Sequence, residues 1–407
     1  MSVLELAKVT GDWRLEGERT APPDGFAALP DIPAKRYTSA EFFDLEQHAL
    51  RNSWLYAIHD RELEKPGAYL RWERLGEPLF FVKGNDGRIR CFYNTCRHRG
   101  APVVTQERGE AAAGRLVCGY HGWTYALTGE LKGYRDKRDF ADFDRSCRSL
   151  IEVRCEDIEG FYFVNLSGTA RPLIQELGAL GATFRRYQPQ RMRHVNRSGT
   201  VQQCNAKVLQ DAFMEVYHLN SVHPDTAAKF LDHSRSRMTL WPHGHSIMVT
   251  PVRDDYRHWN AANEVTLERV ADVSEISRRA NVSMCFFPNT VASMDAWGFF
   301  FLTFWPLSTR QSYFEVNWFG LDWGAASRPD QWEGIMDNLQ VLLREDTQFA
   351  SAIQRSVESS GFRGIPLNYQ ERRIYHWHEE MDRRIGLEHI PAELRVVPRL
   401  GDQVERE

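Results

Sequence analysis

FYNTCRHRGA at residues 92–101 and CGYHGWTY at residues 118–125 are the two stretches that decide the fold of this chain. Each contains one cysteine and one histidine: Cys96 with His98 in the first, and Cys118 with His121 in the second. Such a set could hold zinc, but structural zinc sites usually group their cysteines together and their histidines together. In a mixed-ligand two-iron cluster, two thiolates hold one iron and two imidazoles hold the other. The alternation of residue types therefore favours the iron–sulfur cluster over zinc.

The residues around these ligands resemble the two cluster loops of the Rieske non-haem iron oxygenases. The resemblance implies a Rieske [2Fe-2S] cluster and a terminal oxygenase (alpha) subunit of the aromatic-ring-hydroxylating dioxygenase type. One departure is visible, because the 19 residues between His98 and Cys118 are slightly more than is usual in that family. GEAAAG at residues 109–114 is interpreted as a small insertion at a loop tip, where length changes are tolerated.

Length and charge limit the classes of protein to consider. The chain has 407 residues, which indicates more than one domain, and its net charge of −4 leaves no basic surface for nucleic acid. The first residues lack a secretory signal, and the longest apolar stretch, residues 296–307, is too short to span a membrane. The cysteines outside the two loops lack paired spacing and are expected to be reduced thiols. We therefore expect a cytoplasmic protein without membrane or nucleic-acid partners.

The chain is predicted to contain three regions of an α+β protein. Residues 1–50 form an N-terminal arm, in which Thr38 and Glu41 fit a capping box before a helix over 42–54. Residues 51–167 carry short β-type runs, such as 79–82, 89–93 and 160–164, and form an all-β Rieske [2Fe-2S] domain. Residues 168–407 mix helical and strand patterns and form the catalytic domain, for which the resemblance implies a helix-grip (START-like) fold.

Residues 205–224 contain the first candidate ligands of a second metal. Asp211, Glu215 and His218 are spaced by four and three residues, so on a helix they form one polar stripe. His223 lies five residues beyond His218 and would leave that face in a regular helix. We expect a helix end or a π-bulge to return His223 to the side of His218. The residues expected to interrupt the helix are Asn220, Ser221 and Pro224.

A third candidate ligand lies in the predicted helix of residues 329–360. Asp346 falls within an apolar stripe formed by Ile335, Leu339, Leu342, Phe349 and Ile353. A carboxylate on an apolar face must be paired or bound to a cation. By spacing alone, a salt bridge or helix cap explains Asp346 as well as a metal does. Glu345 lies off the stripe and is expected in solvent.

His218, His223 and Asp346 together match the two-histidine, one-carboxylate triad of mononuclear non-haem iron(II) oxygenases. In Rieske oxygenases an acid precedes the first histidine by three residues, and Glu215 occupies that place. Most ring-hydroxylating members have Asp there. The resemblance implies that this acid bridges the cluster histidine of one subunit, His121, and His218 of its neighbour. The alternative for Glu215 is an ordinary solvated helix residue.

The resemblance also implies the reaction and its partners. The expected cofactors are the Rieske cluster and a mononuclear Fe(II), which activates O₂ beside the substrate. The chain shows no Gly-rich phosphate loop, so the electrons are expected from a separate NAD(P)H-dependent reductase, directly or through a ferredoxin. A homotrimer or a multiple of it is implied, and a β subunit remains open. The competing class is an iron–sulfur electron carrier without oxygenase chemistry.

The predicted substrate is an aromatic or other hydrophobic ring compound, hydroxylated at one or two carbons. The residues placed in its pocket by helix phase or family position are Asp211, Ala212, Val222, Phe287, Asn289 and Phe349. The alternative is a quaternary amine, because Glu at the bridging position resembles the choline and carnitine monooxygenases. An aromatic cage for such a cation could come from Trp241, Tyr256, Trp297, Trp305 and Trp318. The pairs His243/His245 and His376/His378 are interpreted as ordinary surface or packing histidines.

Overall fold

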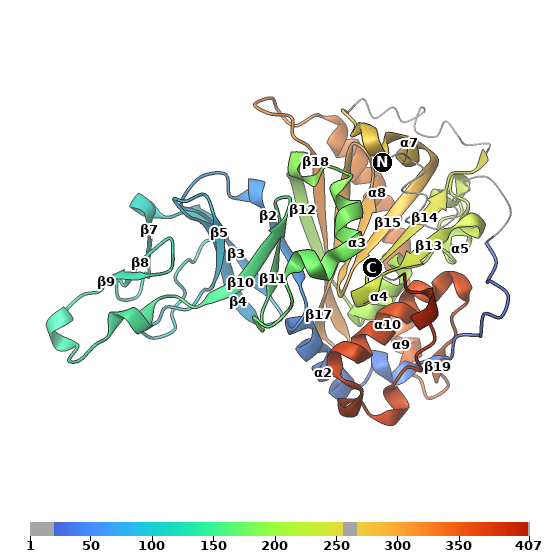
Figure 1. Cartoon of the computed structure of the whole chain (residues 1–407), viewed down its shortest axis with the longest axis horizontal. Helices are drawn as coiled ribbons and strands as arrows, with labels where there is room; N and C mark the ends of the chain where they lie inside the picture. The colour runs from blue at the N-terminus through green and yellow to red at the C-terminus, as the bar shows by residue number, and fades with distance from the viewer. Residues whose placement is uncertain (1–19, 255–266, 406–407) are drawn as a thin grey trace. The chain divides into compact units, whose positions relative to one another are not determined.

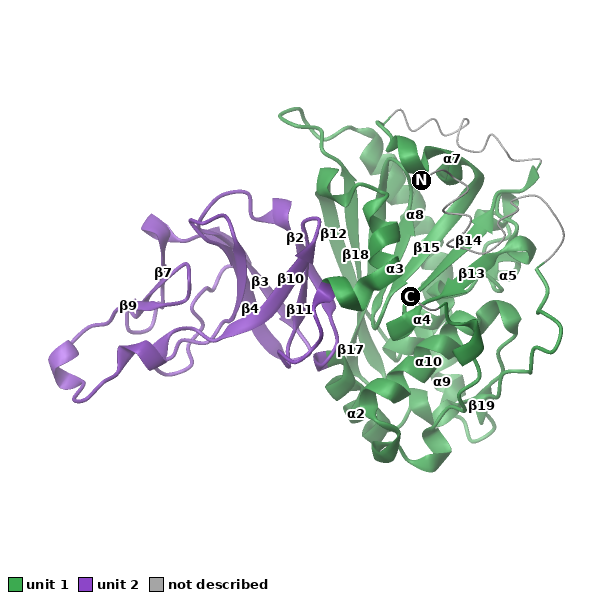
Figure 2. Ribbon diagram, viewed as in Figure 1, with its two compact units in different colours: residues 1–50, 174–407 green, residues 51–173 purple. Residues whose placement is uncertain are grey.

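The computed structural model describes residues 20–254 and 267–405 and divides into two compact units. One unit is residues 51–173, and the other joins residues 1–50 to residues 174–407 (Figure 2). The mixture of strands and helices confirms the α+β class. Within the described residues, no helix has the length and apolar character needed to cross a membrane. None of the seven cysteines forms a disulfide.

The 51–173 unit is built from two antiparallel sheets (Figure 1). Its larger sheet has the order β2-β11-β10-β5-β4-β3-β6, with bounds Leu55–His59, Phe161–Asn165, Glu152–Ile158, Ile89–Tyr93, Glu77–Lys83, Ala68–Arg74 and Arg108–Glu110. The smaller sheet has the order β7-β8-β9, with bounds Arg115–Val117, Thr124–Ala126 and Leu131–Gly133. Strands β4, β5 and β11 confirm the three β-type runs predicted from the sequence.

The GEAAAG segment is not simply a loop tip. Residues Arg108–Glu110 form β6, which pairs antiparallel with β3 through Leu70↔Arg108 and Ala68↔Glu110. Residues Ala112–Gly114 then make a single 3-10 turn. The segment therefore adds an edge strand to the larger sheet, because its backbone finds free hydrogen-bonding groups along β3.

The second unit is centred on a seven-stranded antiparallel sheet of order β12-β18-β17-β16-β15-β14-β13. The strands are Met192–Gln202, Gln311–Leu321, Gly298–Ser308, Thr290–Met294, Ala280–Phe286, Ser246–Pro251 and Arg237–Leu240. A two-stranded sheet pairs β1 (Ile32–Pro33) with β19 (Gly364–Ile365). The helices are α2 (Ala40–Arg51), α3 (Leu173–Arg185), α4 (Ala206–Phe213), α5 (Leu219–Val222), α7 (Ala271–Arg279), α8 (Gln331–Thr347), α9 (Ala350–Val357) and α10 (Arg372–Ile385).

One hydrophobic core joins this sheet to its helices. Helix α4 packs on β17 and β18, and α10 contacts β13. Leu209 of α4, Phe304 of β17, Trp318 of β18, Trp332 of α8 and Tyr375 of α10 all belong to the same buried cluster. The segment that will carry the metal-ligand candidates is therefore held on the sheet at one end, by α4.

The described part of the N-terminal region packs into this second unit. Arg36 is buried and bonds Asp382 of α10 at 2.6 Å, in addition to the β1–β19 pairing. The predicted capping box is wrong, because helix α2 begins at Ala40 and Ser39 Oγ accepts the hydrogen bond from the Phe42 amide at 3.2 Å. Thr38 instead closes the preceding 3-10 turn.

Candidate metal centres

The two cluster loops have the same backbone construction. The amide of Cys96 donates to the carbonyl of Ala101 at 2.8 Å, and the amide of Cys118 donates to that of Trp123 at 2.9 Å. The amide four residues after each cysteine donates back to the cysteine carbonyl, at 2.9 and 3.0 Å. Those positions are Gly100 and Gly122, with φ of 77° and 71°. Glycine is suited to both turns because its lack of Cβ removes the penalty for positive φ.

These turns bring the four predicted cluster ligands together in pairs. Cys96 and Cys118 are buried, and Cys96 Sγ lies 3.2 Å from the hydroxyl of Tyr125. The Nδ1 atoms of His98 and His121 lie 3.1 Å apart, and both imidazoles are partly exposed. Two nitrogens that converge on one point, beside two buried thiols, form the donor set that a mixed-ligand two-iron cluster requires. The residues present therefore fit the group.

The surroundings restrict the orientation of the first histidine. The Trp123 ring stacks on His98 with centroids 4.9 Å apart and planes 8° apart. Burial lowers the pKa of His98, and the neighbouring His121 and Arg99 lower it further, so the imidazole is neutral near pH 7. Burial also raises the pKa of the Cys96 thiol. A neutral imidazole is the form that ligates metal, and the thiol must lose its proton when metal binds.

The segment that carries His218 and His223 is not one continuous helix. Helix α4 ends at Phe213, and His218 is the N-terminal cap of the short helix α5. Helix α5 ends at Val222 with His223 as its C-cap, so the predicted helix end before His223 is present. The predicted helical stripe of Asp211, Glu215 and His218 is wrong, because α4 already ends at Phe213. Glu215 explains the break, because its Oε2 accepts hydrogen bonds from the amides of Tyr217 and His218. A side chain that binds nearby amides competes with the helical hydrogen bonds.

The three predicted ligands of the mononuclear centre lie together. The ligand atoms of His218, His223 and Asp346 are all within 4.8 Å of one another. Asp346 Oδ1 is 2.9 Å from Nε2 of His223 and 3.5 Å from Nε2 of His218. Asp346 belongs to α8, so this meeting joins parts of the chain more than 120 residues apart.

Each histidine has a carboxylate on its other ring nitrogen. Glu215 Oε1 lies 2.5 Å from Nδ1 of His218, and Glu345 Oε2 lies 2.6 Å from Nδ1 of His223. A carboxylate that accepts the Nδ1 proton leaves Nε2 with its lone pair directed at the shared space. This chemistry of the donor set fits a divalent metal. The expectation that Glu345 is simply solvated is wrong.

Burial and charge act in opposite directions on these imidazoles. Burial lowers the pKa of His218, but the hydrogen bond that His218 donates to Glu215 and the charges of Glu215 and Asp346 outweigh burial and raise the pKa. The pKa of His223 is likewise raised, since Asp346 and Glu345 outweigh burial. The site therefore attracts positive charge, either protons or a metal ion.

The predicted apolar stripe is correct for Ile335, Leu339 and Leu342, which are partly buried against apolar clusters, but not for its last two members. Phe349 and Ile353 are 46% and 44% exposed, and Phe349 caps α9 rather than continuing α8. The buried residues of α8 are Trp332, Met336 and Leu343. Asp346 follows Leu343 by three residues and shares that inward face, with 7% of its side chain exposed.

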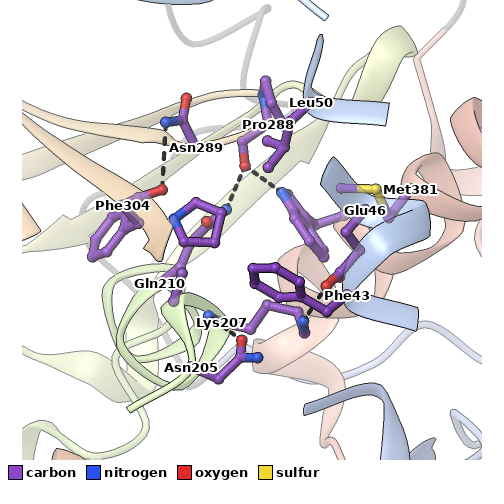
Figure 3. Close-up of a pocket in the computed structure, with 13 residues that line it drawn as sticks. Phe43, Glu46, Leu50, Asn205, Lys207, Gln210, Pro288, Asn289, Phe304 and Met381 are labelled. Carbon is purple, nitrogen blue, oxygen red and sulfur yellow. Dashed lines mark hydrogen bonds and ion pairs between the residues drawn. The ribbon is translucent and has the colours of Figure 1, made fainter. Parts of the chain in front are cut away.

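The other predicted pocket residues are dispersed. Ala212 and Val222 are partly buried, whereas Phe287 and Asn289 are almost fully buried. Asn289 lines a cavity of about 20 Å³ between α2, α4 and the loop after β15 (Figure 3). Gln210 Nε2 donates to the carbonyl of Pro288 beside it, at 2.7 Å. Space of this size fits one water molecule and is too small for an organic substrate.

The aromatic residues proposed for a cage are mostly core residues. Trp241, Trp305 and Trp318 are each at most 2% exposed, and Trp297 packs edge-on against Trp332. Tyr256 lies outside the described residues. Four histidines were predicted to be surface or packing residues rather than metal ligands. Three of them, His245, His376 and His378, are fully buried and are therefore packing residues. Burial lowers the pKa of His245 to about 3 and that of His376 to about 4.

A buried hydrogen-bonded chain ends at Asp211 and was not predicted. Arg36 Nε donates to Nδ1 of His378 at 3.1 Å, so His378 carries its proton on Nε2. That nitrogen lies 3.1 Å from the hydroxyl of Tyr37, which donates in turn to Oδ2 of Asp211 at 2.5 Å. Beside the chain, Lys207 and Glu46 form a buried ion pair. Of the residues in this chain, the sequence analysis had identified only Asp211. Its partners could not be predicted because they come from distant segments.

Two family models match the chain. The model for the Rieske [2Fe-2S] domain matches residues 53–144, and the model for the ring hydroxylating alpha subunit (catalytic domain) matches residues 187–387. A cluster domain and a ring-hydroxylating catalytic domain on one chain define the Rieske oxygenase class, and this protein belongs to that family. The two models imply a Rieske [2Fe-2S] cluster and a mononuclear iron, which confirms the cofactors expected from the sequence.

Several curated relatives are similar over part of their length. The carnitine monooxygenase oxygenase subunit of Escherichia coli (strain K12) is 33% identical over 210 residues, which are 50% of this chain and 55% of the relative. The glycine betaine monooxygenase oxygenase subunit of Chromohalobacter salexigens is 30% identical over 203 residues, 50% and 45% of the two chains. The large oxygenase component of the 2,4-dinitrotoluene dioxygenase system of Burkholderia sp. is 37% identical over 142 residues, 33% and 31%. The matches thus span about half the length of the first relatives.

Solved structures share the fold. The quaternary ammonium Rieske monooxygenase CntA in complex with L-carnitine has a TM-score of 0.74 at 21% identity, covering 90% of this chain and 99% of that one. Naphthalene 1,2-dioxygenase from Rhodococcus sp. bound to indole has a TM-score of 0.70 at 18% identity, covering 87% and 94%.

Proposed function

We propose that this chain is the terminal oxygenase component of a system that uses O₂ and electrons from a separate NAD(P)H-dependent reductase. The observation that carries the proposal is the meeting of His218, His223 and Asp346, with their ligand atoms within 4.8 Å. Two histidines and one carboxylate leave coordination positions open for O₂, which a purely structural site does not need.

The roles of the residues follow from their positions. Cys96, Cys118, His98 and His121 would hold the [2Fe-2S] cluster, and the triad would hold the iron. When bound, the cluster supplies electrons one at a time and the mononuclear iron supplies the activation of O₂. Around the triad, a carboxylate accepts the Nδ1 proton of each histidine, so both Nε2 atoms are aimed inward and would offer their lone pairs to the iron.

Glu215 is proposed as the route by which electrons enter. Its Oε1 already bonds Nδ1 of His218, and the side chain is largely but not completely buried. In a head-to-tail ring of subunits, His121 of a neighbouring copy would meet this carboxylate, and a trimer is the smallest ring that we expect. Loss of oxygenation in Glu215→Ala, with both metal centres kept, supports this route. A fully active monomer in a size measurement contradicts it.

Two substrate classes are proposed. A quaternary amine is favoured by the curated relatives that act on carnitine and glycine betaine, and by Glu rather than Asp at position 215. A hydrophobic ring compound, the class predicted first, is favoured by the similarity to the 2,4-dinitrotoluene dioxygenase component.

A product screen tests the function. The purified holoprotein is supplied with a surrogate reductase and O₂, and quaternary amines and aromatic compounds are compared for oxygenated or dealkylated products. Product formation that needs both O₂ and reductase supports the oxygenase. Cluster reduction and reoxidation without product from either class, in a protein loaded with both metals, would instead indicate an electron carrier.

A further inference from the structure

We propose that Glu345 is a second positioning residue of the mononuclear centre, acting on His223 as Glu215 acts on His218. The inference rests on the proposed role of the triad. It concerns a residue that the sequence placed in solvent, and the carboxylate contacts the ligand histidine rather than the metal.

The geometry places His223 between two consecutive acids of α8. Glu345 Oε2 is 2.6 Å from Nδ1, and Asp346 Oδ1 is 2.9 Å from Nε2, on opposite edges of the same ring. Only one of these nitrogens can face a metal. Because Asp346 and His218 lie on the Nε2 side, Nδ1 must carry the proton and donate it to Glu345. Glu345 thereby selects the tautomer that ligates.

A third residue holds Glu345 in place. Thr226 Oγ1 donates to the same Oε2 at 2.7 Å, and the amide of Thr226 donates to the carbonyl of His223 at 3.2 Å. The three residues therefore form a closed set of hydrogen bonds. The Glu345 side chain is 24% exposed, so it is ordered by these bonds rather than by burial. An unrestrained surface glutamate would lose side-chain entropy in this position without such bonds.

The two positioning acids differ in their sequence separation from the histidine that each one contacts. Glu215 is three residues from His218, so that pair forms within one local turn. Glu345 is 122 residues from His223 and reaches it only when α8 is docked. Since α8 also supplies Asp346, one helix brings both a ligand and the group that orients another ligand. Metal binding at this centre should therefore depend on Glu345 beyond any effect on general folding.

The test measures metal affinity on the full chain with its cluster intact. Co(II) and Fe(II) dissociation constants are obtained by chelator competition for Glu345→Ala, Glu345→Gln and Thr226→Val. We expect Glu345→Ala to weaken binding by about 10–100-fold, as is typical when a group that orients a ligand is removed. Glu345→Gln keeps an oxygen acceptor without its charge and should lose less. Thr226→Val should lose least, because the carboxylate keeps its bond to His223.

The matched control is Asp337→Ala, which removes an exposed acid from the same helix. It should bind both metals like the unaltered protein and show the same Co(II) visible spectrum, whereas the Glu345 variants should shift that spectrum. Affinities and spectra of both Glu345 variants that match the control would overturn the inference. Asp346→Ala tests the proposed triad separately from the role of Glu345. Unchanged metal binding in that variant would count against the triad itself.

Discussion

The substitution Asp211→Asn provides a quantitative test of the buried chain beside the mononuclear centre. Asp211 accepts a hydrogen bond from Tyr37 on Oδ2, and its Oδ1 is buried without a hydrogen-bond partner among the described residues. Burial raises the pKa of this carboxyl to about 7, while the hydrogen bond from Tyr37 and the charge of Lys207 act against the increase. The folded protein therefore holds a proton that the unfolded chain has already lost.

The sign and size of the effect follow from linkage. In the unfolded chain an Asp titrates near ~3.9. Between about pH 4 and pH 7 the folded state binds more protons, so this residue lowers the stability as pH rises through that interval. The loss is about 1.4 kcal/mol per pH unit, or about 4 kcal/mol over the whole interval, and it stops above pH 7. Asn does not titrate, so the free energy of unfolding of the Asp211→Asn variant lacks this dependence on pH.

Urea unfolding of both proteins at pH 5, 6, 7 and 8 measures the difference directly, because the other titrating groups cancel. The stability of Asp211→Asn relative to the unaltered protein should increase by about 2–3 kcal/mol from pH 5 to pH 7 and then level off. Tyr37→Phe is the companion variant. It removes the donor that lowers the pKa, so the slope should persist and extend above pH 7. A difference that stays constant or declines between pH 5 and pH 7 would refute the reasoning.

Four further outcomes are expected. Asp346→Ala should reduce iron from about three to about two per chain and leave about two acid-labile sulfides, and an unchanged iron content would count against the ligand assignment. Glu215→Ala, supplied with iron in excess so that its weakened centre is filled, should keep both centres, measured by metal content and cluster absorbance, yet lose oxygenation. Lys207→Met leaves the buried Glu46 carboxylate unpaired and should cost about 3–5 kcal/mol in urea unfolding, most of which Glu46→Gln should restore in the double variant. Gly122→Ala places an alanine in the left-handed backbone region with its Cβ 3.3 Å from Arg135 Nε, which strains the second cluster loop. The visible absorbance of the cluster should therefore be lost at a lower temperature than in the unaltered protein.

The cluster loops were predictable because their information is local. Both loops place Cys, His and Gly within five residues, and the hydrogen bonds that shape them close within six residues. The strands around them have strong β-type patterns, and β4, β5 and β11 formed where those patterns predicted. The exception was the 109–114 segment, since pairing with β3 depends on an open sheet edge that composition does not reveal.

The mononuclear centre was only partly predictable. The spacing from Glu215 to His218 and His223 identified the candidates and a helix end before His223, but the pattern indicated one continuous helix from Asp211 to His218. The actual break depends on the Glu215 side chain taking two backbone amides, which is a competition that periodicity does not capture. The contact from Glu345 to His223 left no local pattern at all.

The orientation of α8 shows why long-range packing decides the remaining details. Trp332 lies against Gly298 and Gly320, where an added Cβ would meet the indole at 2.9 and 2.1 Å. Two glycines on adjacent strands thus make room for one tryptophan, and its insertion sets which face of α8 is buried. Asp346 lies 14 residues further along the same face, which is close to four helical turns. The third ligand is therefore positioned by packing at the opposite end of its helix, whereas the cluster ligands depend on turns within their own loops. For this reason loss of the mononuclear iron and loss of the cluster should be separable failures, as the contrast between Asp346→Ala and Gly122→Ala is designed to show.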